Sequence, residues 1–416
     1  MTSSRSFATA RPTLLLASCA AIGMTFPATA ETRTEVRVSG GIGVENNPFL
    51  LEDGTENGAS VAAELDVAPN ILITNERSSF QLYGNARLRQ FFDGYDTTSS
   101  LLLGAQGTTR VDERTQLGAG ATFQTSRSAA QDAFIFNNQD LIGLEPGTVP
   151  TIPIIDPTIA GARTRFTTFG ATGSVNRQLN ERNSASLGLA FSQSETSNDL
   201  GFDYRVADAT LGWNRRLTER TDLKTSVGLS KSDLIGFEAG DAISITPLIG
   251  IQQQVSPRLN WSGQVGISYS KIDDGLGGDI ENTGFAFSLN GCRRDLRGNL
   301  CLTAERQARP TTFSGLTTST AVIVGYDLEL SQRDSIRADA TYRKSDRIAS
   351  PLLMDDAISD NDEFVGVSTT YRRTFTDRLS AYASASYSQI FSDLFPDRDA
   401  NIRGYVGVSY VFGRRQ

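Results

Sequence analysis

Histidine is absent from all 416 residues of the chain. Histidine is the usual general base of enzymes, so its absence excludes hydrolysis by a Ser-His-Asp arrangement and proteolysis by an Asp-His pair. The chain also has no glycine loop that would hold a phosphate at the start of a helix, and no recognisable nucleic-acid-binding module. We therefore predict a protein that is not an enzyme, needs no cofactor and does not bind nucleic acid.

Long apolar runs are missing as well. After Ala30 no segment reaches the roughly 18 consecutive apolar residues that a transmembrane helix requires, which excludes a helical membrane protein. The N-terminus carries Arg5 and Arg11, then the apolar run 14–22, and then the small residues 28–30. This order predicts a secretory signal peptide over residues 1–30. Residues 16–19 can alternatively be interpreted as a lipoprotein cleavage motif.

Cysteine is scarce, and only Cys292 and Cys301 remain after the predicted signal peptide. They lie symmetrically about a short turn at residues 293–300. In an oxidising compartment this arrangement predicts a disulfide across a hairpin. Two thiols without any histidine make a poor metal site, and we predict no bound metal.

A short turn signature recurs through the chain at intervals of about 38 residues, which indicates tandem β-hairpins. An acidic residue or proline is usually followed by arginine. The seven copies are 75–78, 112–115, 180–183, 218–221, 256–259, 332–335 and 376–379. The hairpin that holds the two cysteines supplies an eighth turn.

Between the turns, apolar residues alternate with polar or small ones. Leu117, Ala119, Ala121 and Phe123 share one face of such a segment, with Gln, Gly and Thr on the other. Period two is the period of a β-strand, and a strand of roughly 9–11 residues with one apolar face can cross a membrane in a β-barrel. A propeller also repeats at roughly 40–50 residues, but it folds four short strands into each period and commonly carries a Trp-Asp signature, which this chain lacks.

These elements predict an all-β protein, a transmembrane antiparallel β-barrel of about 18 strands that occupies residues 31–416. The first strand is expected at 33–44 and the last at 401–413, so that both ends lie at the rim of the short turns. Pro69, Pro247 and Pro310 fall in or beside predicted strands and cannot donate to a sheet ladder, which leaves 16 strands as the alternative.

The last predicted strand resembles the C-terminal signal of Gram-negative outer-membrane proteins. The resemblance rests on Tyr405, Gly407, Tyr410 and Phe412, and it implies recognition by the barrel-assembly machinery. The chain departs from that pattern because residues 413–416 follow the terminal aromatic residue. The resemblance also implies that the protein is located in the bacterial outer membrane, in contact with lipid and lipopolysaccharide.

The long connections at the opposite rim are acidic, which suits solvation, the binding of divalent cations with lipopolysaccharide, or the attraction of cations toward a pore. One of them, at residues 128–162, is instead rich in apolar side chains. By chain order it is the third outer loop, the position at which general porins fold a loop into the pore. Capping of the barrel mouth and packing on a neighbouring subunit explain its apolarity equally well, and the oligomeric state stays open.

The polar face of the predicted strands carries charges of both signs, which predicts a wet lumen. Glu64 with Asp66, and Asp327 with Glu329, are carboxylate pairs on this face, and such charges normally pair across strands or tune selectivity. The predicted pore-lining residues are Arg87, Arg89, Lys224, Asp327, Glu329, Arg337, Asp339, Arg343 and Arg372. Ion pairs that merely close the interior are the alternative interpretation.

In general style the mature chain resembles the β-barrel porin families of proteobacteria, including members that occur beside exopolysaccharide export systems. The resemblance rests on hairpins closed by Glu-Arg or Asp-Arg turns, and it includes no functional motif. It implies an outer-membrane channel for small hydrophilic solutes or for an anionic polysaccharide. The alternative is a structural or adhesive surface barrel whose acidic loops bind cations and which has no open pore.

Overall fold

The computed structural model describes residues 31–50, 58–127, 165–197, 203–235, 241–273, 278–311, 315–349, 361–392 and 398–413. The predicted signal peptide at 1–30 and the predicted apolar loop at 128–162 both lie outside the described residues. No described helix is long and apolar enough to cross a membrane.

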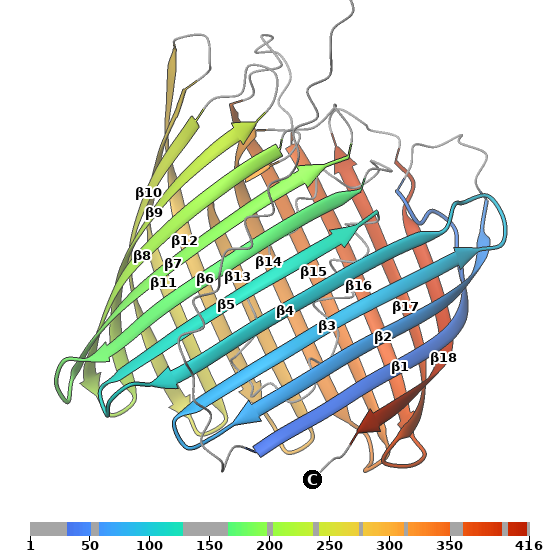
Figure 1. The fold of residues 1–416 in the computed structure, drawn as a ribbon. Helices are drawn as coiled ribbons and strands as arrows, with labels where there is room; N and C mark the ends of the chain where they lie inside the picture. The colour runs from blue at the N-terminus through green and yellow to red at the C-terminus, as the bar shows by residue number, and fades with distance from the viewer. Residues whose placement is uncertain are drawn as a thin grey trace, which may run out of the picture.

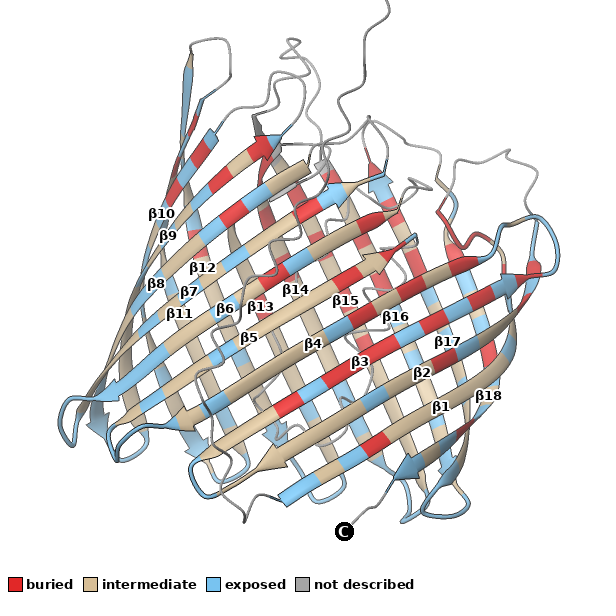
Figure 2. Ribbon diagram, in the orientation of Figure 1, coloured by how far each residue is buried: buried red, intermediate tan, exposed pale blue. Residues whose placement is uncertain are grey.

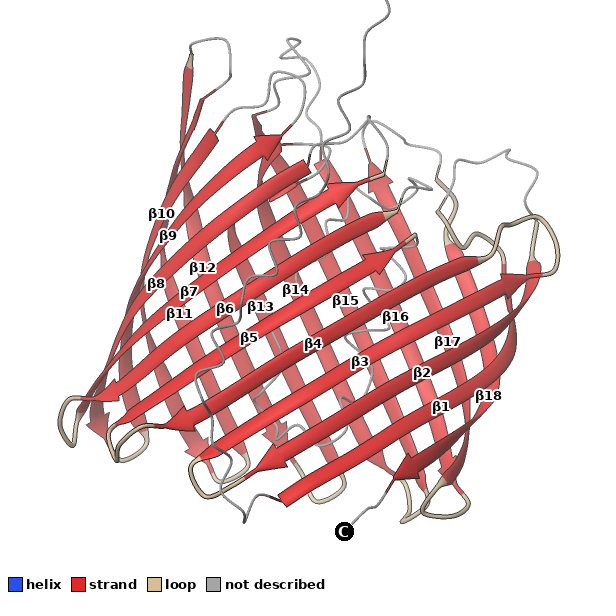
Figure 3. Cartoon of the chain, in the orientation of Figure 1, coloured by secondary structure: helices blue, strands red, loops and turns tan. Residues whose placement is uncertain are grey.

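Eighteen strands form one closed antiparallel barrel (Figures 1 and 3). Each strand pairs with its neighbours in the chain, and β1 closes the circle by pairing with β18 from Glu35↔Gly413 to Glu45↔Arg403. The prediction of 18 strands is confirmed, and the alternative of 16 is wrong. The strands are β1 Glu31–Glu45, β2 Ser60–Thr74, β3 Ser78–Phe91, β4 Thr98–Arg110, β5 Thr115–Ser126, β6 Phe166–Gln178, β7 Asn183–Thr196, β8 Asp203–Thr218, β9 Thr221–Ile235, β10 Asp241–Ser256, β11 Leu259–Asp273, β12 Asp279–Arg294, β13 Gly298–Thr311, β14 Gly315–Glu329, β15 Asp334–Ala349, β16 Asn361–Thr374, β17 Leu379–Ser392 and β18 Asn401–Gly413.

The predicted outward stripes lie on the outside of the barrel, and the polar residues between them face the lumen. Large apolar side chains such as Leu189, Ile267 and Phe285 are 54%, 54% and 57% exposed, while lumen serines such as Ser126 and Ser270 are buried (Figure 2). This inverts the burial pattern of a water-soluble protein. An apolar exterior around a polar interior is the arrangement of a transmembrane barrel.

All eight short turns are present, although the one predicted at 332–335 begins one residue earlier at Ser331, and the structure shows why they recur. In seven turns a side-chain oxygen at the first position accepts a hydrogen bond from the backbone N–H of the arginine two residues later. The N···O distances are 2.9 Å for Asn75–Arg77, 2.7 Å for Asp112–Arg114, 3.0 Å for Asn180–Arg182, 3.2 Å for Thr218–Arg220, 3.2 Å for Ser256–Arg258, 3.1 Å for Ser331–Arg333 and 3.3 Å for Thr376–Arg378. Asn, Asp, Ser and Thr favour turns through this type of bond.

The same arginines join consecutive hairpins through their carbonyl groups. In all eight turns the arginine C=O accepts an N–H from a residue at or near the end of the strand that pairs with the second strand of the hairpin: Arg77 from Arg110 at 2.8 Å, for example, and Arg182 from Arg216 at 2.7 Å. At Asp112 the bond from the Arg114 N–H holds the pKa of the exposed carboxyl below its usual value. The signature therefore stabilises its own turn through the side chain at its first position, and it binds the neighbouring hairpin through the arginine carbonyl group.

Pro69 and Pro247 lie within β2 and β10 and interrupt the ladder on one side only. Pro69 pairs with β1 but leaves a gap toward β3, and Pro247 pairs with β9 but leaves a gap toward β11. Proline has no N–H to donate on that side. Glycine lies against the gap in each case, since a Cβ at Gly266 would overlap the Pro247 carbonyl and one at Gly84 would lie 3.4 Å from the Pro69 ring. The ladder resumes beyond both gaps.

The predicted disulfide is present. Cys292 on β12 and Cys301 on β13 are paired residues with a Cα–Cα distance of 4.2 Å, and their sulfur atoms are bonded. The bond lies on the lumen side of the hairpin, as the alternation predicts.

The side-chain acceptor of the turns can be tested at Asn180, whose Oδ1 accepts from the backbone N–H of both Arg182 and Asn183. We expect Asn180→Ala to destabilise the refolded barrel by about 1 kcal/mol, because those two N–H groups lose their partner. Reversible urea unfolding in lipid vesicles measures the change. Asn180→Asp keeps the side-chain acceptor, and Arg182→Ala keeps the backbone N–H and C=O of residue 182. The free energy of unfolding of each control should stay within about 0.5 kcal/mol of that of the unmodified chain. An equal loss of stability in all three variants would contradict the proposed role of the side-chain acceptor.

Candidate functional site

Charge is unevenly distributed around the lumen. The lumen faces of β5, β6, β7, β10 and β11 carry Ser, Thr, Asn, Gln, Gly and a few apolar residues within the described strands. The charged side chains gather on the arc from β13 through β18 to β3, with a smaller group on β8 and β9. One arc of the wall therefore offers hydroxyls and amides, and the other offers guanidinium and carboxylate groups.

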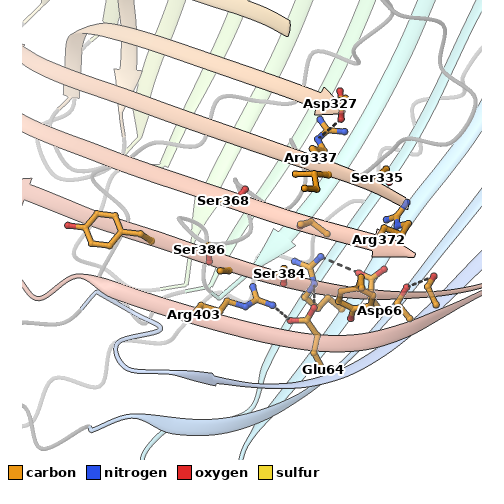
Figure 4. A pocket seen from close by; sticks show the side chains of 18 of the residues that line it. Glu64, Asp66, Asp327, Ser335, Arg337, Ser368, Arg372, Ser384, Ser386 and Arg403 are labelled. Carbon is orange, nitrogen blue, oxygen red and sulfur yellow. Dashed lines mark hydrogen bonds and ion pairs between the residues drawn. The ribbon is translucent and has the colours of Figure 1, made fainter. Parts of the chain in front are cut away.

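A buried ion cluster lies where the two ends of the barrel meet. Glu64 on β2 is its centre, at 2.6 Å from Arg403 on β18, 3.1 Å from Arg89 and 3.5 Å from Arg87, both on β3. Glu45 on β1 is 3.5 Å from Arg89 and 3.3 Å from Arg403. Strands β18, β1, β2 and β3 are therefore joined by charge as well as by backbone pairing. Figure 4 shows the pair of Arg403 with Glu64.

Asp66 extends this cluster along β2. It accepts hydrogen bonds from Asn85 at 2.8 Å and from Arg87 at 3.2 Å. The Arg87, Arg89 and Glu45 side chains are 3%, 1% and 0% exposed. Charges buried to this degree are stable only when they are paired, so the cluster is expected to respond strongly to the loss of one member.

Two glycines on the lumen face of β1 leave the space that this cluster needs. A Cβ at Gly43 would overlap the Tyr405 ring, and one at Gly41 would lie 2.9 Å from the Tyr382 hydroxyl. Because these positions lack side chains, Arg403 can reach from β18 across β1 to Glu64 on β2. The Arg403 guanidinium also stacks on Tyr405, with 4.0 Å from its carbon to the ring centre.

The chain after β1 turns inward above this cluster. The side chains of Asn46 and Asn47 donate to the backbone carbonyls of Ala400 at 3.1 Å and Asp399 at 2.9 Å. Leu50 is 1% exposed and packs on Phe364 and Ile390 of the lumen wall, and its φ of 53° is an uncommon backbone conformation for leucine. These contacts hold the chain that follows Glu45 against β16, β17 and residues 399–400.

Next to the cluster lies a lumen cavity of about 420 Å³. Its lining residues come from β14–β18 and β1–β3, which form one continuous arc of the barrel wall, and Figure 4 shows several of them. Arg337 contacts Asp339 at 3.2 Å and Asp327 at 3.7 Å on one side of it. The other features of the lining are Tyr382 and a row of serines at alternate positions of β17, namely Ser384, Ser386 and Ser388.

The predicted pore-lining residues divide into three groups. Arg87, Asp327, Glu329, Arg337 and Arg372 line the cavity. Arg89, Asp339 and Arg343 face the lumen but are buried in the wall, and Lys224 lies on β9, away from this cavity. Whether any of them lines a conducting path stays a prediction.

The sequence interpretation missed Glu45, Arg37, Arg403, Tyr382 and the β17 serines as parts of this site. Arg37 and Arg403 share the lumen-facing alternation of their strands, so the period-two pattern could have identified both. Glu45 lies one residue beyond the predicted end of the first strand. Among the described residues, no group of three or more Cys, Asp or Glu side chains could hold a metal ion.

The C-terminal residues of the predicted assembly signal divide between the two faces. Tyr405 is 2% exposed on the lumen side, whereas Tyr410 and Phe412 lie on the exterior with ring centres 4.7 Å apart. Their recognition by assembly machinery stays a prediction.

The sequence matches no family model and no curated protein. Solved structures with a similar fold include Pseudomonas aeruginosa OccK2 (OpdF) in complex with glucuronate, with 10% identity and a TM-score of 0.45 over 92% of this chain and 99% of that chain. OprD of the same species has 12% identity and a TM-score of 0.42, covering 93% and 96%. The FrpB iron transporter of Neisseria meningitidis has 8% identity and a TM-score of 0.42, covering 92% and 83%. Likeness at this level identifies no corresponding residues and no solute.

The chain's own features define its class. Closed antiparallel barrels with an even strand number, an apolar exterior and a polar interior are the form taken by bacterial outer-membrane proteins. This chain has each of these features.

The ion cluster can be tested at its centre. We expect Glu64→Gln to lower the free energy of unfolding by about 3–5 kcal/mol, because three buried arginines then share fewer carboxylates. Lys271→Gln breaks the exposed pair with Asp279, 2.8 Å long on the outer surface, and should cost less than about 1 kcal/mol. Urea unfolding of both variants in vesicles measures the difference, and equal effects would show that the Glu64 pairs add little to barrel stability.

Proposed function

We propose that this barrel is an outer-membrane channel that passes small hydrophilic solutes. The observation that supports it best is the lumen cavity, whose lining combines ionised groups with hydroxyls. Asp327 and Arg337 keep 51% and 29% of their side chains exposed, so they can exchange a partner for a passing solute. A cavity of about 420 Å³ is within the range of small-molecule sites, roughly 300–1,000 Å³.

The division of the wall into two arcs supports the same proposal. Charges of opposite sign along one arc create a local field, and the neutral arc of Ser, Thr and Gln supplies hydrogen bonds without strong binding. A solute with hydroxyl groups and a charge could contact both arcs while it moves. The comparisons give no support to polysaccharide export, so the proposal is confined to small solutes.

Ion conduction in planar bilayers tests the channel. We expect refolded protein to give unitary currents, and the double substitution Arg337→Gln/Arg372→Gln to shift the reversal potential toward cation preference, because two positive charges leave the cavity lining. Asp327→Asn should shift it in the opposite direction. Arg182→Gln, in an exposed turn, serves as the control and should leave selectivity unchanged.

Absence of any unitary current from correctly folded protein, at every voltage tried, would reject the channel and leave the structural or adhesive barrel. Currents with an unchanged reversal potential in both lumen variants would show that these residues lie off the conducting path.

A further inference from the structure

One seam of the barrel, the boundary between β12 and β13, is paired along only half of its length. β12 pairs with β11 all the way to Asp279, and β13 pairs with β14 as far as Thr311. Between β12 and β13, however, the ladder ends at Phe287↔Arg306. The outer part of β12, residues 279–286, therefore lacks pairing with β13, and the two strands separate above Arg306.

The outer ends of β13 and β14 lie inside the barrel. Ala308 on β13 and Leu316 on β14 belong, by the alternation of their own strands, to the outward face. They nevertheless pack on Ala242 of β10 and Ile272 of β11, which face the lumen, and Ala242, Ile272 and Leu316 are 2–4% exposed. An outward face can contact the inner wall only if this part of the hairpin has bent into the lumen.

The opposite face of the bent segment turns toward β8. β13 contacts β8, although the two strands are not neighbours in the sheet. Arg309 lies near the carboxylate of Asp208 and the phenol of Tyr204 on β8, and it also contacts Glu305 at 3.0 Å. The bent segment thus lies against the inner face of β8–β11 and occupies part of the lumen.

The sequence also allows a closed seam, in which the outer part of β13 pairs with the outer part of β12. If the β12–β13 register continued past Phe287↔Arg306, Ala308 would face Phe285 and Arg309 would face Gly284. Ala308 and Phe285 would then both point outward, and Arg309 would point into the lumen opposite a glycine with open space at its Cβ position. Pro310 would follow opposite Thr283, and it has no N–H to extend the ladder, which limits the closed pairing to a few residues.

The two arrangements are stabilised by different interactions. The bent form buries apolar side chains of β10, β11, β13 and β14, but among the described residues it leaves the outer edge of β12 without a paired strand, which barrels normally avoid. The closed form adds backbone hydrogen bonds between β12 and β13, turns Ala308 and Leu316 outward, and uncovers Ala242 and Ile272 to the lumen. When two packings are stabilised by such different interactions, a protein can exchange between them.

We propose that the outer ends of β13 and β14 form a gate, which is bent into the lumen in this structure and which opens the channel by pairing with the outer part of β12. The gate rests on the channel function proposed above, because a change in conductance can be measured only if the barrel conducts. Its movement can be measured independently by disulfide trapping.

Two cysteine pairs trap the two positions, in a Cys292→Ser/Cys301→Ser background. Phe285→Cys/Ala308→Cys should cross-link only in the closed seam, and Ile272→Cys/Leu316→Cys only in the bent form. Val265→Cys/Phe287→Cys joins two outward residues that are already paired, so it should cross-link without changing conductance. Gel mobility before and after reduction gives the yield of each bond, and bilayer recording gives the unitary conductance.

We expect both trapping pairs to form, with conductance at least twofold higher in the 285–308 bond than in the 272–316 bond, and a return to a common value on reduction. Failure of the 285–308 pair to form, while 272–316 and the control form, would overturn the gate. So would formation of both with equal conductance, or failure of the 272–316 pair. If the unmodified protein never conducts, the proposed channel fails, and the cross-linking yields still decide whether the segment moves between two positions.

Discussion

A strand that crosses lipid must pair every backbone N–H and C=O, because no water is available to satisfy them. The rest of this structure follows from that requirement. At the rim, where sheets usually fray, the backbone groups of the turn arginines are also paired. The N–H of Arg182 donates to the Asn180 side chain, and the C=O of Arg182 accepts the N–H of Arg216 in the next hairpin. Repeated turn by turn, these bonds build a continuous wall from separate hairpins. The exceptions, at the prolines and above Arg306, are therefore informative.

The elements that the sequence predicts well are governed by local chemistry. Strand number, the eight turns and the Cys292–Cys301 bond depend on period-two alternation and on residues a few positions apart, which are visible without a fold. Even there, the boundary of one motif was misplaced: the acceptor of the turn before Arg333 is Ser331, one residue ahead of the predicted copy at 332–335. The acceptor at the first position explains the repeat better than its arginine side chain does.

The ion cluster was harder to predict because its members come from opposite ends of the chain. Arg403 meets Glu45 and Glu64 only when β18 pairs with β1, and the meeting also needs Gly41 and Gly43 to have no side chains. Alternation shows that such residues face inward, but it does not show which of them meet. The bent ends of β13 and β14 were equally hidden, since their alternation suits an ordinary wall position and only the missing ladder and the contacts of Ala308 reveal where they lie.

The closure cluster also bears on the order of assembly. In a chain that lacks its final strand, the carboxylates of Glu45, Glu64 and Asp66 would keep Arg87 and Arg89 as cationic neighbours and would lose the guanidinium of Arg403. Arg403 lies on β18, the last strand. The charges of the cluster on β1–β3 are therefore incompletely balanced until β18 pairs with β1. A truncated product would carry excess negative charge at its open edge, which disfavours its entry into lipid as an unclosed sheet.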